Sequence, residues 1–216
     1  MKLYTYFRSS AAYRVRIALN LKELPYEAVP VHLLRSEEDA PAYRALSPLG
    51  TVPTLVTDEN DGGTALTQSL AIIEYLDEVH PRPPLLPADA LGRARVRALA
   101  LTIACDIHPL NNLRVLNYLK QHFGASDEQK NAWYRHWVMD GLLACEKLLA
   151  DHPDTGDFCH GDAPSLADCC LVPQVFNARR FDCPLDGMPT IRRIAEACEA
   201  LPAFAAAAPQ NQPDAT

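Results

Sequence analysis

The sequence predicts an α/β domain at the N-terminus followed by an all-α domain. Strand-like and helical segments alternate over residues 1–80, a proline-dense stretch follows, and only helical periodicity occurs after it. We therefore expect a first domain of residues 1–80, a linker of residues 81–90 and a helical domain of residues 91–216.

The first domain begins with a βαβ unit. The segments KLYTYF (2–7) and YEAVPV (26–31) have the composition of strands, and the residues between them carry apolar side chains at helical spacing. A loop rich in proline and glycine then leads into a strand within residues 46–58. Residues 64–80 predict a short strand followed by an apolar helix, so the order is β-α-β-loop-β-β-α.

Proline marks the end of this domain. The segment PRPPLLPAD (81–89) is unsuitable for a helix interior or a central strand, which indicates a linker. Beyond it, helical periodicity covers residues 91–122, 127–151, 165–180 and 190–200, and the last nine residues, APQNQPDAT, predict a polar tail. Ser165 and Asp168 resemble a capping box at a helix start, for which we expect a structural role.

Composition excludes several classes of partner. The chain has 216 residues, 48% hydrophobic and 22% charged, and a net charge of −7, which is typical of a globular protein and argues against nucleic-acid or anionic-membrane partners. No apolar run could span a bilayer and MKLYTYFRSS lacks the features of a signal peptide, so we expect a cytoplasmic protein. Seven cysteines without a CxxC pair predict reduced, mostly buried thiols, with neither disulfides nor a zinc site.

Two short motifs suggest a site for a peptide-like anion. Pro53 begins a strand and cannot donate to the ladder; if its peptide bond is cis, the backbone groups of Val52 are available to an extended ligand. Gln68 and Ser69 start a helix, and N–H groups at a helix start attract carboxylates. Each motif alone is weak, and an ordinary turn remains the alternative for Pro53.

The chain resembles the zeta class of glutathione transferases over nearly its whole length. The resemblance rests on YFRSSAAYRVRIAL (6–19), QSLAIIEYL (68–76), PLNNLRVL (109–116), DCCLVPQVFNARRF (168–181) and QPD (212–214). It implies the glutathione transferase fold, in which the first domain is thioredoxin-like, together with glutathione as cofactor and a homodimer.

The resemblance also implies a reaction. Zeta-class isomerases convert maleylpyruvate to fumarylpyruvate, or maleylacetoacetate to fumarylacetoacetate, by thiolate addition, bond rotation and elimination during aromatic-compound catabolism. Resemblance favours maleylpyruvate here. Two alternatives stay open: a conjugating detoxification transferase, which would consume glutathione, and a non-catalytic binding module, which would not need an activating hydroxyl.

Two serines lie at the N-terminus of the first predicted helix. A thiol has a pKa of about 8.5, and lowering that pKa by two units needs about 2.7 kcal/mol of preference for the thiolate. A hydroxyl that donates to sulfur at a helix start provides this kind of stabilisation. By resemblance Ser9 is the thiol-activating residue and Ser10 the second candidate, while simple helix capping is the alternative. Ala11 stands where the zeta class usually has cysteine, which argues against any activity that needs an enzyme thiol here.

Three arginines are candidates for binding carboxylates. A maleyl keto acid carries two carboxylates and glutathione is anionic, so an acidic protein needs local cations, for which the planar guanidinium is well suited. By resemblance Arg180 holds a substrate carboxylate, and position suggests the same for Arg8 and Arg114.

Three further residues are candidate ligand contacts. His108 lies where the family often has glutamine, and we expect it to donate a hydrogen bond near the reacting groups. Asn112 is a candidate glutathione contact and His32 a weaker one. A metal site of His108 with Cys105 and Asp106 is disfavoured, because the three do not share one helix face.

Overall fold

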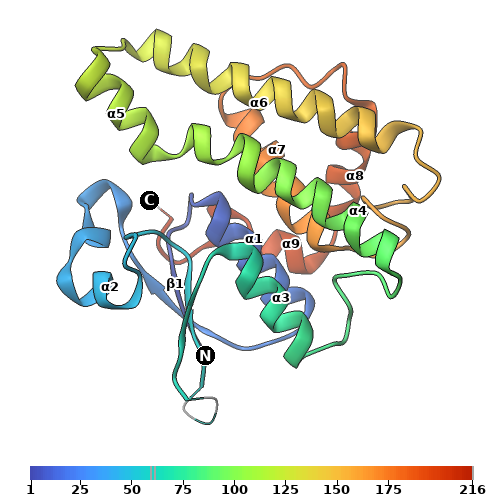
Figure 1. The fold of residues 1–216 in the computed structure, drawn as a ribbon, viewed down its shortest axis with the longest axis horizontal. Helices are drawn as coiled ribbons and strands as arrows, with labels where there is room; N and C mark the ends of the chain where they lie inside the picture. Colours follow the sequence, from blue (N-terminus) through green and yellow to red (C-terminus); the bar gives the residue numbers. More distant parts are fainter. Residues whose placement is uncertain (59, 61, 216) are drawn as a thin grey trace. The chain divides into compact units, whose positions relative to one another are not determined.

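The computed structural model describes residues 1–58, 60 and 62–215 (Figure 1). The chain forms two compact units, one of Met1–Leu85 with Ala200–Thr216 and one of Leu86–Glu199. The first is called unit 1 and the second unit 2. This division differs from the expected helical domain of residues 91–216, because the last 17 residues belong with the N-terminal part of the chain.

Unit 1 contains a four-stranded mixed sheet. Its strands are β1 (Lys2–Thr5), β2 (Glu27–Pro30), β3 (Thr54–Val56) and β4 (Ala65–Thr67), in the order β2-β1-β3-β4. The β1 and β2 strands are parallel, and β3 is antiparallel to both β1 and β4. All four strands were predicted, and each is shorter than the segment of sequence in which it was expected.

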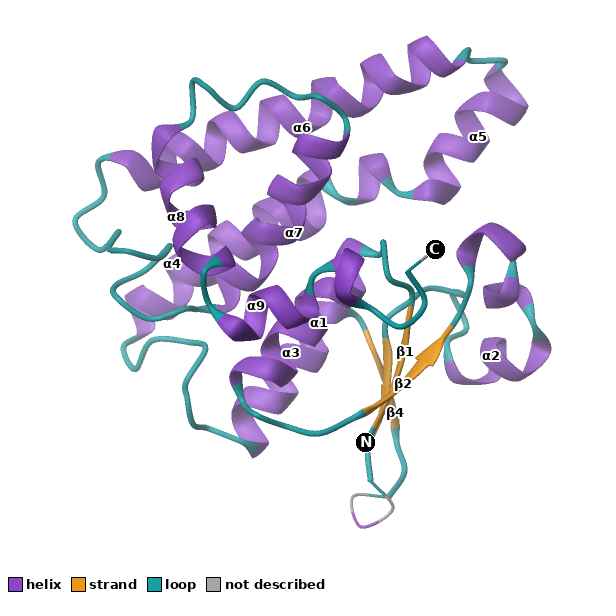
Figure 2. Ribbon diagram, turned by 180° about the vertical axis from the view of Figure 1, so that it is seen from behind, coloured by secondary structure: helices purple, strands orange, loops and turns teal. Residues whose placement is uncertain are grey.

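The helices of unit 1 cover both sides of this sheet. They are α1 (Ser10–Leu21), α2 (Pro41–Leu46), α3 (Ser69–Val79) and α9 (Pro202–Ala207), with short 3-10 helices at Leu33–Arg35, Glu37–Asp39 and Pro209–Asn211. Figure 2 shows α1, α3 and α9 on one side of the strands and α2 on the other. Leu3, Leu55, Ile17 and Ile72 are fully buried between these layers.

The prediction of a polar tail after residue 207 was wrong. The Asn211 amide donates to Ala205 O at 2.7 Å, and the Gln212 amide donates to Ala206 O and Ala208 O at 2.9 and 3.0 Å. Asp214 accepts a hydrogen bond from the Phe7 backbone at 2.9 Å. The polar residues that suggested a solvated tail therefore satisfy backbone groups of unit 1.

Unit 2 is helical in its described residues. Its elements are α4 (Ala90–Leu101), the π-helix η4 (Thr102–Ile107), the 3-10 helix η5 (Pro109–Asn111), α5 (Leu113–Phe123), α6 (Asp127–Ala150), α7 (Leu166–Arg180) and α8 (Pro189–Glu199). Residues 91–122 thus form no single helix. Pro109 lacks the N–H that a continuing helix needs, and the Asn112 side chain accepts from Arg114 N at 3.1 Å to start α5.

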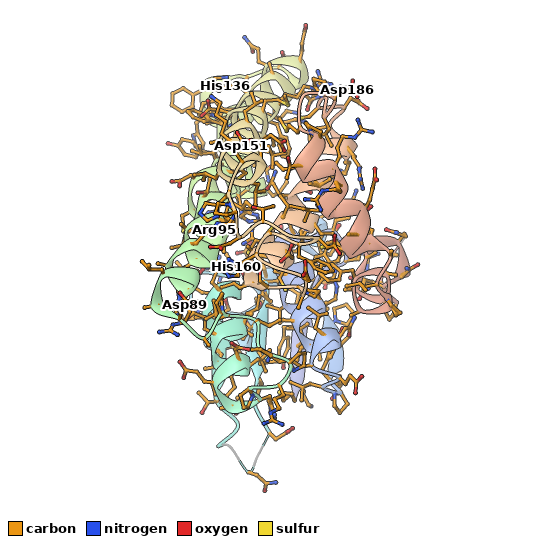
Figure 3. All side chains as sticks on the ribbon, turned by 90° about the vertical axis from the view of Figure 1, so that its right-hand side faces the viewer. Asp89, Arg95, His136, Asp151, His160 and Asp186 are labelled. Atoms are coloured by element: carbon orange, nitrogen blue, oxygen red, sulfur yellow. The ribbon has the colours of Figure 1, made fainter. Side chains whose placement is uncertain are left out.

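The predicted capping box at residue 165 is present and structural. The buried Asp168 carboxylate accepts from Ser165 N and Ser165 Oγ at 2.8 and 2.7 Å, and from Cys159 N at 2.8 Å. Arg95 holds the same loop by donating to Cys159 O at 2.6 Å, and it lies beside His160 (Figure 3). These contacts position the start of α7, the central helix of unit 2.

Candidate functional site

The register of the sheet brings the unit 1 candidates to one edge. Thr5 at the end of β1 pairs with Pro30 at the end of β2, while Tyr4 pairs with Thr54 at the start of β3. Thr54 in turn pairs with Thr67 at the end of β4. The residues that follow β1, β2 and β4 and precede β3 must therefore lie together. They are Arg8, Ser9, His32, Val52, Pro53, Gln68 and Ser69.

Ser9 is the N-cap of α1. Its backbone is extended, with φ −70° and ψ 114°, and its Oγ accepts a hydrogen bond from Ala12 N at 3.2 Å. Because that bond uses only an oxygen lone pair, the hydroxyl proton can still be donated to a ligand. Ser10 is the first residue within α1 and is buried. Capping and thiol activation are thus compatible roles for Ser9, whereas Ser10 is less accessible to a ligand.

Arg8 is held by the aromatic rings that precede it. Its Nη2 donates to the Tyr6 hydroxyl at 3.0 Å, and its guanidinium carbon lies 4.9 Å from the centre of the Phe7 ring. Both rings belong to the buried cluster that also contains Val52. The ordered guanidinium is therefore available as a local cation next to Ser9.

Gln68 and Ser69 form the start of α3, and the guanidinium of Arg14 contacts Ser69. Gln68 has a positive φ of 70°, which turns the chain sharply from β4 into the helix. The Ser69 hydroxyl accepts from Arg14 Nη1 at 3.2 Å, and both side chains are buried. The helix start and the Arg14 guanidinium both favour a bound anion. Arg14 was not singled out from the sequence, where it follows the pattern of an amphipathic helix.

His32 and Val52 complete this edge. The His32 ring lies 5.3 Å from the Tyr6 ring, and its Nδ1 is buried without a hydrogen-bond partner among the described residues. A buried polar atom without a partner requires an explanation, and a polar ligand at this edge would provide one. The Val52–Pro53 peptide bond is cis, as the interpretation of this segment required.

Two segments of unit 2 carry the remaining candidates, and α6 connects them. Asn111 Nδ2 donates to Tyr134 O at 3.3 Å, which fixes the segment that bears His108 and Asn112. The Tyr134 ring stacks on the Phe181 ring at 3.6 Å between centres. Phe181 directly follows Arg180, so Tyr134 contacts both segments.

Arg180 and Arg179 have different surroundings. The Arg180 guanidinium carbon lies 5.0 Å from the centre of the Phe181 ring, and the side chain is exposed. Arg179 forms an ion pair with Glu199 at the end of α8. Arg180 therefore remains available for an anionic ligand, whereas Arg179 is already paired. Arg114 lies in the first turn of α5 and is exposed.

None of the cysteines provides a nucleophile at the N-terminus of α1. All seven are free thiols in the structure, and the predicted burial is found for six of them. Burial raises the pKa of Cys145 to about 12 and also raises the pKa of Cys183. The thiols of Cys145 and Cys183 are therefore neutral and unreactive at neutral pH.

The described residues contain neither a cluster of metal-ligating side chains nor a membrane-spanning helix. No three His, Cys, Asp or Glu side chains in this part of the chain are grouped as metal ligands. Within the same residues, no helix has the length and apolar character needed to cross a bilayer.

Comparison with known proteins assigns the family. Residues 8–79 match the family described as "Glutathione S-transferase, N-terminal domain". The probable maleylacetoacetate isomerase of Vibrio cholerae is 53% identical over 215 residues, covering 99% of this chain and 97% of that protein. A solved structure of maleyl pyruvate isomerase, described as a bacterial glutathione S-transferase in the zeta class, matches with a TM-score of 0.96 and 52% identity over 100% of both chains.

The chain belongs to the zeta class of glutathione transferases. The maleylacetoacetate isomerase of Methylobacterium extorquens AM1, solved with bound malonate and GSH, also matches with a TM-score of 0.96 and 42% identity over 100% of both chains. The predicted family and fold class are thereby confirmed.

The second residue of α1 in this zeta-class chain is Ala11, so the residue that follows Ser9 and Ser10 carries no thiol. The residues that sequence reasoning missed are those that support the candidates rather than contact a ligand. Tyr6 accepts a hydrogen bond from Arg8, and Arg14 donates one to Ser69. Tyr134 stacks on Phe181, the residue that follows Arg180. A weak signal existed for Tyr6, because it adjoins the FRSS motif.

Proposed function

We propose that the protein is a glutathione-dependent cis-trans isomerase of a maleyl keto acid, with maleylpyruvate to fumarylpyruvate as the favoured reaction and maleylacetoacetate to fumarylacetoacetate as the other. The observation that carries the proposal is the Ser9 hydroxyl, which caps α1 and keeps its proton available at the sheet edge where Gln68 and Ser69 begin α3. Similarity to isomerases over whole chains supports it.

The residues at this edge suit glutathione. The start of α3 with Arg14 favours its γ-glutamyl carboxylate, the backbone beside Pro53 suits its peptide portion, and Ser9 suits its sulfur. His32 has an unsatisfied ring nitrogen for the same ligand. When bound, glutathione supplies a thiolate that adds reversibly to the double bond and is regenerated.

The chain's own residues then have three tasks. Ser9, with Ser10 as the second candidate, stabilises a negative charge on sulfur by donating a hydrogen bond. Arg180 binds one substrate carboxylate, and Arg8 and Arg114 add cationic character for the other. His108 donates to an oxygen on which charge develops, and Asn112 contributes to glutathione binding in unit 2.

Two further properties belong to this proposal. We propose a homodimer, which the zeta-class resemblance implies, and a cytoplasmic location. A conjugating transferase would use the same Ser9 site, so only the fate of glutathione separates the two activities.

The isomerase should need only a catalytic amount of glutathione. We expect each maleyl keto acid to be converted over many turnovers with substoichiometric glutathione, because addition followed by elimination returns the thiol. The measurement follows the cis-trans change by absorbance and counts free thiol at the end. Loss of one thiol for each substrate converted would instead identify a conjugating transferase, and the absence of any turnover would favour a binding module.

The start of α3 should bind the γ-glutamyl carboxylate of glutathione. Ser69→Ala removes a donor to an anion, and such a bond contributes about 1.5 to 3 kcal/mol, so we expect roughly 10- to 150-fold weaker binding by calorimetry. Gln68→Gly tests the neighbouring side chain while preserving the positive φ at that position. Glu78→Gln, an exposed change in the last turn of the same helix, is the control. Unchanged affinity in Ser69→Ala combined with Gln68→Gly would refute the assignment.

A further inference from the structure

The turn that carries Ser9 also contains Tyr6, Phe7 and Arg8. It runs from Tyr6 to Ser9 between β1 and α1, and Ser9 N donates to Tyr6 O at 2.9 Å. Any movement of Tyr6 or Phe7 therefore moves both the Ser9 hydroxyl and the Arg8 guanidinium. The contacts that fix Tyr6 and Phe7 decide the geometry of this turn.

One of these contacts is a fully buried arginine on α1. Arg16 donates from Nη2 to Phe7 O at 3.0 Å and from Nη1 to Thr5 Oγ1 at 3.0 Å, with a longer bond to Tyr6 O at 3.4 Å. Its Nε donates to Ala207 O, at the end of α9, at 3.0 Å. One guanidinium thus joins the turn to the C-terminal segment, residues 200–216.

Arg16 keeps its charge in this position. Burial lowers the pKa of its guanidinium to about 10, and interactions with Tyr26, Asp214 and Tyr13 oppose that shift. A pKa of about 10 leaves the group protonated at neutral pH. All of its donors therefore remain available for the backbone acceptors of the turn and of α9.

The C-terminal segment makes a second contact with the turn. The Asp214 carboxylate accepts from Phe7 N at 2.9 Å, and Ala215 packs against the cluster formed by Tyr6, Phe7, Val31, Tyr43 and Val52. Phe7 therefore has its carbonyl held by Arg16 and its N–H held by Asp214.

The segment itself is anchored independently of Asp214. Phe204 is fully buried, and Asn20, one turn after Arg16 on α1, donates to Ala203 O at 3.0 Å. The amides of Asn211 and Gln212 then bind carbonyls of residues 205–208. Asp214 and Ala215 therefore belong to a segment that has its own contacts with unit 1.

We propose that the C-terminal segment is a positioning element for the proposed active site, with Asp214 and Arg16 as positioning residues that fix the turn bearing Arg8 and Ser9. The proposal rests on the proposed role of Ser9 in activating the glutathione thiol. Neither Asp214 nor Arg16 is a catalytic residue, since each acts on the turn through the backbone of Tyr6 or Phe7.

The test uses changes at Asp214, because Arg16→Met risks unfolding the protein. Asp214→Ala removes the acceptor for Phe7 N, whereas Asp214→Asn retains an oxygen at that place. At saturating glutathione we expect Asp214→Ala to lower kcat on the order of 10-fold, with KM for the maleyl keto acid within two-fold of the wild type. The acidic limb of its kcat profile should move to higher pH, because a displaced Ser9 stabilises the thiolate less.

Asp214→Asn should recover most of the lost kcat and return the acidic limb toward its original position. Gln210→Ala, an exposed change in the same segment, should match the wild type in both measurements. If Asp214→Ala has the kcat and acidic limb of the wild type, or if Asp214→Asn is as impaired as Asp214→Ala, the proposal is wrong.

Amide hydrogen exchange followed by NMR separates this proposal from the proposed function. We expect Asp214→Ala to speed exchange at the amides of Phe7 and Ser9 while the amides in the centre of α3 keep their rates. This result does not depend on turnover. A wild type without glutathione-dependent activity would refute the proposed function, whereas unchanged Ser9 exchange in Asp214→Ala would refute the positioning role.

Discussion

Ser9→Ala should lower kcat/KM about 100-fold, the usual effect of removing one hydrogen bond to a developing or stabilised anion. The Ser9 hydroxyl accepts from Ala12 N at the start of α1 and has its proton free for the glutathione sulfur. Ser10 is buried within the first turn, so Ser10→Ala should have a much smaller effect on turnover. Steady-state kinetics with saturating glutathione measures both.

Helix capping complicates Ser9→Ala, and two further variants remove that ambiguity. Loss of an N-cap costs about 1 kcal/mol of stability in an alanine variant but only a few tenths in a glycine variant. Ser9→Gly should therefore be nearly as stable as the wild type and as slow as Ser9→Ala. Ser9→Thr, which keeps a hydroxyl, should retain most of the activity. Small and equal losses in Ser9→Ala and Ser10→Ala would show that both serines only cap the helix.

Arg180→Met should lower kcat/KM for the maleyl keto acid roughly 10- to 150-fold and leave the affinity for glutathione nearly unchanged. The expected loss follows from the removal of a charged hydrogen-bonding partner, which contributes about 1.5 to 3 kcal/mol. The Arg180 guanidinium lies over the Phe181 ring and is exposed, so it is free to bind a carboxylate. Steady-state kinetics measures kcat/KM for the keto acid, and calorimetry measures the affinity for glutathione.

Arg179→Met is the matched control, since it removes the same charge from the neighbouring residue. Arg179 is paired with Glu199, and surface ion pairs contribute about 0 to 1 kcal/mol, so this variant should differ little from the wild type in turnover. If Arg179→Met is the more damaging change, then the carboxylate-binding arginine is residue 179 and its assignment to residue 180 is wrong. If Arg180→Met weakens glutathione binding as much as turnover, the ligand has been assigned wrongly.

Local sequence patterns predicted most of the fold, because the apolar periodicity within a segment is enough to indicate a strand or a helix. The apolar strands and the amphipathic α1 and α3 helices follow their expected periods, and the cis bond before Pro53 fits the proline motif. The register of the sheet then brings the candidate residues to one edge. Their proximity follows from pairing between strands distant in sequence, which only the topology could reveal.

The features that sequence reasoning missed depend on distant partners. Arg16 reads as a polar residue on a surface helix, yet carbonyls from residues 6, 7 and 207 make its burial possible. The polar residues after 207 likewise suggest a solvated tail, because the backbone groups that they bind cannot be identified from the sequence. Ile107, at the end of the η4 π-helix, packs against Gly141 on α6, where an added Cβ would lie 2.2 Å from Ile107 Cγ1. No local pattern in residues 102–107 reports that contact.

The ionisation of glutathione bound to the protein tests the central claim most directly. A pH titration of thiolate absorbance in the binary complex should give a thiol pKa about two units below the usual value of about 8.5 in the wild type. In Ser9→Gly the pKa should return most of the way to that of free glutathione, while Ser9→Thr should stay close to the wild type. A wild-type complex whose thiol titrates like free glutathione, or a Ser9→Gly complex with an equally lowered pKa, would contradict thiol activation by Ser9.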